Sequence, residues 1–176
     1  MKKVVITFGL ISGAVISLMM LLTVPFMDSI GFENGAILGY TTMVLSFLLV
    51  YFGVRSYRDN VAGGTITFAK AFTTGILITL ISCACYVVTW EVIYFNFVPD
   101  FLDKYLAHTI ETARAAGASA ESIQAQIKEF DEFKALYQNP FFNVAMTFIE
   151  PFPVGLIMTL ISAAMLRKSA KQKMGS

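Results

Sequence analysis

One acidic residue lies deep inside a long apolar run. Glu150 falls within the otherwise uncharged stretch 141–166, and sixteen uncharged residues separate it from Arg167. At about 1.5 Å per helical residue, this places its carboxylate about 24 Å from the basic end of the run. A charged group at the centre of a bilayer costs about 2.5–3.5 kcal/mol, so a carboxylate at such depth must be protonated, paired or hydrated.

Polar groups around Glu150 suggest two interpretations. Asn143, Thr147 and Glu150 are spaced four and three residues apart and share one helix face. Pro151 and Pro153 lack backbone N–H groups, so they free carbonyl oxygens in the preceding turn. This kinked segment fits a proton or cation site. It equally fits a structural clamp, in which Glu150 bonds to a neighbouring helix and fixes the kink.

A second carboxylate, Glu91, follows the uncharged run 71–90. It fits either a hydrated position at a membrane surface or a second member of the Glu150 site. No Lys or Arg lies inside an apolar run to neutralise Glu150. The nearest candidates lie in residues 98–139 or at the end of the run before Glu91. The cations of that segment are Lys104, Arg114, Lys128 and Lys134.

Catalytic and metal-binding patterns are not visible in the sequence. Cys83 and Cys85 are two residues apart, so they do not face each other on a helix, and His108 stands alone. No nucleophile motif with a partner base is found. The sequence therefore predicts no catalytic residue, no metal site and no cofactor, and we expect that the protein is not an enzyme.

Composition favours a membrane environment. The 176 residues are 56% hydrophobic and 14% charged, whereas soluble domains are about 25% charged and about 45–50% apolar. The net charge of +1 argues against a nucleic-acid partner, which requires a basic surface.

The apolar runs predict an all-α fold of one integral membrane domain, residues 1–176, containing a four-transmembrane-helix bundle. The predicted spans are residues 4–27, 35–54, 68–90 and 141–166. Residues 98–139 alternate apolar and polar positions at helical spacing, which predicts a helical hairpin with a turn at Gly117. Plausible helix N-caps are Asn34, Thr65 or Thr67, Ser119 and Asn139.

Lys and Arg residues divide between the two ends of these spans. One end carries Lys2, Lys3, Arg55, Arg58, Lys70, Arg167, Lys168, Lys171 and Lys173. The other end carries only the four cations of the hairpin. Because positive residues near spans remain in the cytoplasm, we predict a multi-pass protein of the bacterial cytoplasmic (inner) membrane. Both termini would be cytoplasmic and the hairpin extracytoplasmic.

Small residues recur every four positions in each predicted span. These stripes are Gly9/Gly13/Ser17, Gly35/Gly39, Thr67/Ala71/Gly75/Thr79/Cys83 and Gly155/Thr159/Ala163. Such stripes let helices approach closely in lipid. They could form a homo-oligomer face, contact a membrane partner protein, or pack within one bundle.

The basic loop has two interpretations as well. Arg55, Arg58 and Lys70 are candidates for contact with anionic lipid headgroups. Alternatively, they form a docking surface for a cytoplasmic partner.

Several sequence blocks carry a family resemblance. They are Phe52-Gly-Val-Arg-Ser-Tyr-Arg-Asp-Asn60, Gly64-Thr-Ile-Thr-Phe-Ala-Lys-Ala71, Trp90-Glu91 and Phe152-Pro-Val-Gly-Leu156. With them the chain resembles the DUF4199 family, small bacterial membrane proteins of unknown function. The resemblance covers nearly the whole chain. It implies a four-span bacterial membrane protein and brings no activity or site residues.

Two functional hypotheses remain. The first is a non-enzymatic membrane scaffold or interaction protein whose main surroundings are the lipid bilayer. The second is a small proton- or cation-linked transporter or carrier subunit that uses Glu150 and a second polar group. The surroundings of Glu150 would distinguish them.

Overall fold

Helices form almost all of the described chain, residues 1–167 of this computed structural model. In order, they are α1 (Lys2–Thr23), the 3₁₀ helix η1 (Val24–Phe26), α2 (Met27–Ile30), α3 (Phe32–Asn60), α4 (Phe68–Asn96), α5 (Phe101–Ala115), α6 (Ala120–Tyr137), α7 (Pro140–Ile149) and α8 (Pro151–Leu166). The all-α prediction is confirmed. The tail residues Lys168, Lys171 and Lys173 lie outside the described residues.

Four helical stretches are long and apolar enough to cross a membrane. They are Lys2–Ile30, Phe32–Asn60, Phe68–Asn96 and Pro140–Leu166. The helices run further than the apolar segments that predicted them. Thus α3 continues six residues past the predicted end, through Arg55 and Arg58, and α4 continues past Trp90.

Side-chain caps mark the starts of three helices, α4, α6 and α7. The side chains of Thr67, Ser119 and Asn139 each accept a hydrogen bond from a backbone N–H in the following turn, as predicted. The prediction of Asn34 as an N-cap is wrong. Gly31, with φ of 82°, precedes α3 instead, and the Asn34 amide lies in the first turn and donates to the Ile30 carbonyl at 3.0 Å.

Small residues bring α1 against α4. A Cβ atom at Gly9 would lie 2.8 Å from the Ile81 side chain, and Ser82 Oγ donates to the Gly9 carbonyl at 3.2 Å. Ser17 and Thr89 bond through their hydroxyls at 2.8 Å further along the same interface. This stripe therefore packs within the chain.

The stripes of α4 and α8 also meet each other. The Thr79 and Thr159 hydroxyls lie 3.0 Å apart, and Thr79 Oγ1 donates to the Gly155 carbonyl at 3.3 Å. A Cβ atom at Gly155 would overlap the Thr79 methyl group. The Gly35/Gly39 stripe of α3 differs in one position: a Cβ at Gly35 would overlap the Met27 side chain, but a Cβ at Gly39 would meet nothing within 4 Å. A homo-oligomer face would have to use residues other than those already packed inside the chain.

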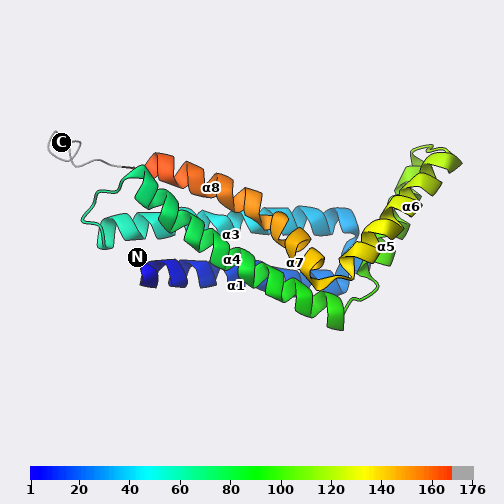
Figure 1. The fold of residues 1–176 in the computed structure, drawn as a ribbon, viewed down its shortest axis with the longest axis horizontal. Helices are drawn as coiled ribbons and strands as arrows, with labels where there is room; N and C mark the ends of the chain where they lie inside the picture. Colours follow the sequence, from blue (N-terminus) through cyan, green and yellow to red (C-terminus); the bar gives the residue numbers. More distant parts are fainter. Residues whose placement is uncertain (168–176) are drawn as a thin grey trace.

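Different elements lie at the two ends of the molecule (Figure 1). The start of α1, the α3–α4 loop and the end of α8 lie together at one end, and Arg58 Nη1 donates to the Leu166 carbonyl there at 3.5 Å. Helices α5 and α6 lie at the opposite end and contact each other. An apolar cluster joins α5 and α6 to the long helices. Its buried members are Met20, Val24, Trp90, Ile93, Tyr94, Leu102 and Tyr137.

Candidate functional site

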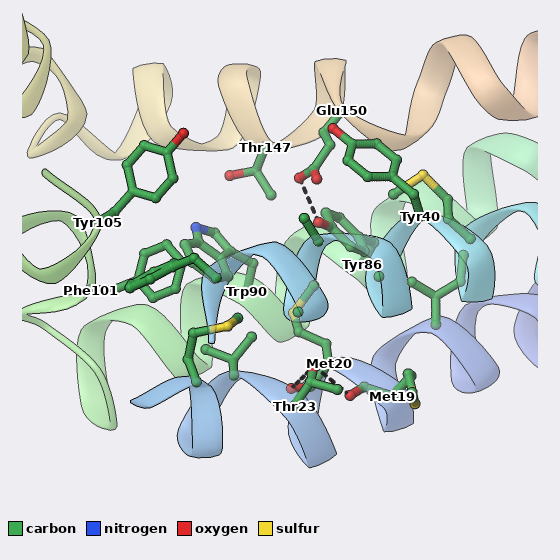
Figure 2. A pocket seen from close by; sticks show the side chains of 18 of the residues that line it. Met19, Met20, Thr23, Tyr40, Tyr86, Trp90, Phe101, Tyr105, Thr147 and Glu150 are labelled. Atoms are coloured by element: carbon green, nitrogen blue, oxygen red, sulfur yellow. Dashed lines mark hydrogen bonds between the residues drawn. The ribbon is translucent and has the colours of Figure 1, made fainter. Parts of the chain in front are cut away.

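The fourth long stretch is broken at Glu150. Helix α7 ends at Ile149 and α8 begins at Pro151, whose missing N–H interrupts the helical hydrogen-bond pattern. The Glu150 carboxylate points toward α4, where the Tyr86 hydroxyl donates to its Oε2 at 2.6 Å (Figure 2). The break therefore places an acidic side chain between two helices.

Glu150 and Tyr86 line a cavity of about 480 Å³. Helices α1 to α7 and η1 all contribute residues to its wall, and Figure 2 shows side chains from several of them. Its aromatic lining residues are Phe32, Tyr40, Tyr86, Trp90, Phe101, Tyr105, Phe133 and Tyr137. Its methionines are Met19, Met20, Met27, Met43 and Met146. Glu150 is the only charged residue among the described residues that line it. The volume falls within the roughly 300–1,000 Å³ typical of small-molecule sites.

Gly39 leaves part of this volume open. It lines the cavity from α3, one residue before Tyr40. Since a Cβ at Gly39 would contact nothing, any larger side chain there would extend into free space. Gly39 thus borders the cavity, whereas Gly35 of the same stripe packs against Met27 of α2.

Asn143 and Thr147 belong to a buried hydrogen-bond network. Trp90 Nε1 donates to the Tyr137 hydroxyl at 2.9 Å, and that hydroxyl lies 3.3 Å from Thr147 Oγ1. Thr147 donates to Asn143 Oδ1 at 3.1 Å, and Asn143 Nδ2 donates to the Tyr137 carbonyl at 3.4 Å. The network joins α4, α6 and α7. Asn143 is fully buried and does not line the cavity, whereas Thr147 does.

The Tyr137 hydroxyl is neutral in this network. Burial raises the pKa of Tyr137, which outweighs the lowering caused by its hydrogen bonds with Thr147 and Trp90. A neutral hydroxyl can accept a hydrogen bond from Trp90 and donate one to Thr147. These groups satisfy one another, so the network is structural.

Glu91 is not brought to the cavity. It is half-buried on α4, and it is not among the residues that line the cavity. Its Oε1 atom and the Tyr94 hydroxyl are buried and have no hydrogen-bond partner within the described chain. Glu91 thus lies outside the cavity that Glu150 lines.

The hairpin cations do not neutralise Glu150. Lys104 forms ion pairs with Asp28 at 2.7 Å and Asp100 at 3.3 Å, and Lys134 pairs with Asp103. The hydrogen bond that Lys104 donates to Asp28 is the main cause that raises the pKa of Lys104. Among the described residues no ion pair includes Glu150. Its partner is a tyrosine hydroxyl, which the sequence did not indicate.

The basic loop is held by its own acidic residue. Arg58 pairs with Asp59 at 2.6 Å, and Arg55 approaches the same carboxylate at 3.6 Å. Lys70 is exposed and forms no ion pair with the described residues. These three cations lie at the end of the molecule opposite the cavity helices α5 and α6 (Figure 1).

Tyr86 and Tyr40 are the residues that sequence reasoning missed. A phenol in the uncharged run before Glu91 was the available signal, since a buried tyrosine hydroxyl usually finds a partner.

His108 stacks on Phe32 with centroids 5.2 Å apart, and Cys83 is fully buried. Residues 1–167 contain no group of three or more His, Cys, Asp or Glu that could hold a metal ion.

Comparison with known proteins gives one family. The profile described as "Protein of unknown function (DUF4199)" matches residues 7–168. Searches of curated proteins and of solved structures found no match. The family match confirms the resemblance inferred from the sequence blocks.

Proposed function

The chain belongs to the DUF4199 family, a family of unknown function, and we propose that it is a non-enzymatic integral membrane protein that binds a small, largely apolar molecule. The carrying observation is the cavity of about 480 Å³ with aromatic and methionine walls. Such walls are typical of small-molecule sites, and methionine side chains adapt to varied ligand shapes. The proposal thus assigns a specific binding site, this cavity, to a membrane interaction protein.

The proposed location is the bacterial cytoplasmic membrane, with both termini cytoplasmic and the α5–α6 hairpin outside. The basic residues Lys2, Lys3 and Arg55 belong to the end that holds the start of α1 and the α3–α4 loop (Figure 1). Cytoplasmic loops are enriched in Lys and Arg, which supports this orientation. The cavity would then lie in the outer half of the membrane, beneath the hairpin.

The cavity edge supports entry of the ligand from the membrane. Tyr40 on α3 is 53% exposed and Met146 on α7 is 36% exposed, although both line the cavity. Glu150 is exposed at the same edge. In the proposed orientation this edge faces lipid, so an amphipathic molecule could move in laterally without crossing the headgroup layer.

Cavity filling tests this proposal. Purified protein in a nonionic detergent would be titrated with N-phenyl-1-naphthylamine, an uncharged probe whose fluorescence rises in apolar sites. We expect saturable binding, weakened at least about tenfold by Gly39→Leu, because the new side chain occupies the cavity; tenfold corresponds to about 1.4 kcal/mol.

The matched control is Ala84→Leu. Ala84 is exposed on α4 and does not line the cavity, so the same added volume should leave probe affinity unchanged. Equal affinity of both variants and wild type would contradict the proposed site.

A second candidate is a proton- or cation-linked carrier. One observation favours it: the Glu150 carboxylate lines the cavity, and intramembrane carboxylates commonly mark proton or ion pathways. In proteoliposomes, this candidate predicts uptake of a small molecule that is driven by a cation or proton gradient. Glu150→Gln should abolish that uptake. Binding without any coupled flux in wild-type protein would leave only the binding role.

A further inference from the structure

The one charged side chain of residues 1–167 that lines the cavity lies at its exposed edge. Glu150 is the one charged side chain among the described lining residues, and no Lys or Arg contributes to the wall. Its hydrogen-bond partner among the described residues is the Tyr86 hydroxyl. An ionised carboxylate in apolar surroundings is costly unless paired. A cationic ligand would remove that cost, whereas an anionic ligand would increase it.

Aromatic rings surround the position that a cation would take. Tyr40 and Tyr86 flank the Glu150 carboxylate, and Trp90 and Tyr105 lie further along the same cavity (Figure 2). Cations are attracted to the faces of tryptophan and tyrosine rings, and this attraction strengthens when water is excluded. Because ring attraction acts on any compact cation, an organic ammonium or phosphonium group is suited to this environment.

The remainder of the cavity is apolar. Met19, Met20 and Thr23 of α1 lie on the side opposite Glu150, and the Thr23 hydroxyl is already used by the backbone carbonyls of Met19 and Met20 (Figure 2). This wall therefore offers surface to a hydrocarbon or aromatic body and little hydrogen bonding. A ligand that fills the space carries its charge at one end.

We propose that the cavity binds a lipophilic organic cation whose charged group lies at Glu150, between Tyr40 and Tyr86. Its apolar body extends toward Met20. Tyr86 holds the carboxylate in place through its hydroxyl, and Glu150 supplies the charge selectivity. This assignment rests on the proposed function, since it names the ligand class of the same cavity.

Two ions of nearly equal shape and opposite charge test the assignment. Tetraphenylphosphonium and tetraphenylborate would each be titrated calorimetrically into the full-length protein in an uncharged detergent. We expect the phosphonium to bind at least about tenfold more tightly than the borate. Glu150→Gln should remove this preference by weakening phosphonium binding at least about tenfold, a loss of about 1.4 kcal/mol.

Further variants separate charge from packing. Tyr86→Phe keeps the carboxylate and removes its donor, so we expect a smaller loss of phosphonium affinity. Glu91→Gln, at a carboxylate of the same helix bundle that does not line the cavity, should change nothing. The wild-type preference between the two ions remains a complete test if a Glu150 variant does not fold.

The outcomes distinguish this inference from the proposed function. Equal binding of both ions, unaffected by Glu150→Gln but weakened by Gly39→Leu, overturns the cation assignment and keeps the apolar binding site. Tighter binding of the borate also overturns the assignment. Absence of saturable binding for both ions and for N-phenyl-1-naphthylamine overturns the binding role itself.

Discussion

At the scale of single residues, the Tyr137 hydroxyl connects three helices. Tyr137→Phe would leave Trp90 Nε1 buried without its acceptor and would remove the contact with Thr147. A buried polar group without a partner costs about 1–3 kcal/mol. We expect the free energy of unfolding to fall by about this amount, measured by titration with sodium dodecyl sulfate in mixed micelles.

Tyr105→Phe is the matched control for this network. Tyr105 is 44% exposed, and its hydroxyl forms no hydrogen bond with the described residues. Losing that hydroxyl should therefore leave the free energy of unfolding nearly unchanged. Equal effects of the two substitutions would show that the Tyr137 network does not stabilise the fold.

The ion pair between Lys104 and Asp28 makes a pH-dependent contribution. Hydrogen bonding to Asp28 and then to Asp100 raises the pKa of Lys104 above its ordinary value of 10.5. The stabilisation is therefore fully present below that value and is lost as pH rises through the folded-state pKa. The melting temperature of Lys104→Met should lie slightly below that of wild type at pH 7. The difference should vanish when the pH exceeds the folded-state pKa of Lys104.

A salt titration and a control variant at another lysine test the contribution of the Lys104–Asp28 ion pair. The difference at pH 7 should shrink in concentrated salt, because exposed ion pairs are screened. Lys128→Met changes an exposed lysine without an ion pair among the described residues, and it should show no such pH dependence. A Lys104→Met difference that persists at high pH would contradict the electrostatic explanation.

Spacing predicted part of the candidate site. The intervals between Asn143, Thr147 and Glu150 placed them on one helix face, and Pro151 marked the break, because both effects are local. Their partners could not be predicted in the same way. Tyr86 lies 64 residues from Glu150 along the chain, and only the packing of α7 on α4 brings the two together.

At the scale of helices, Gly155 determines how closely α8 approaches α4 and α3. A Cβ at this position would overlap Thr79 and lie 2.9 Å from the Phe47 ring. Helix association in lipid depends on such close packing. We expect Gly155→Ala to lower the free energy of unfolding by about 1–3 kcal/mol, since overpacking forces these neighbours to shift.

Gly39→Ala is the corresponding control on α3. A Cβ there meets nothing within 4 Å, and alanine stabilises a helix by roughly 0.5–1 kcal/mol relative to glycine. Gly39→Ala should therefore be neutral or stabilising in the same unfolding titration. Destabilisation comparable to that of Gly155→Ala would indicate that glycine content, and not close packing, governs both positions.

Helix boundaries show which local signals were sufficient. Asn139 followed by Pro140 predicted the start of α7 correctly, since a cap and a first-turn proline act within one turn. Asn34 carried the same type of signal and failed. The positive φ of Gly31 begins α3 earlier, and competition between two adjacent start signals depends on how the preceding helix ends.

At the scale of the whole molecule, the distribution of charge predicts the orientation. In intact spheroplasts, a membrane-impermeant maleimide should label Ala116→Cys, which is exposed after α5. Val61→Cys, at a residue 53% exposed in the α3–α4 loop, should react only after permeabilisation. Wild-type protein controls for Cys83 and Cys85, which are buried and half-buried. The reverse labelling pattern would invert the proposed topology.

Four apolar runs and their small-residue stripes were enough to predict an all-helical fold with four candidate spans. The cavity was not predictable from them. It is the volume left over where helices α1 to α7 meet, and that volume depends on side-chain placements such as those of Tyr40 and Met43. Periodicity identifies which face of a helix carries small or apolar residues. It does not show where packed helices leave a cavity between them.

The interlocking of α8 with earlier helices has a consequence for biosynthesis. Helices α1, α3 and α4 contact one another, and all three leave the ribosome before α8 is synthesised. The contact surface for α8, which includes Gly75, Thr79 and Phe47, can therefore be complete when the last helix arrives. Insertion of α8 closes the assembly, and its final carbonyl meets Arg58, a residue made more than a hundred positions earlier.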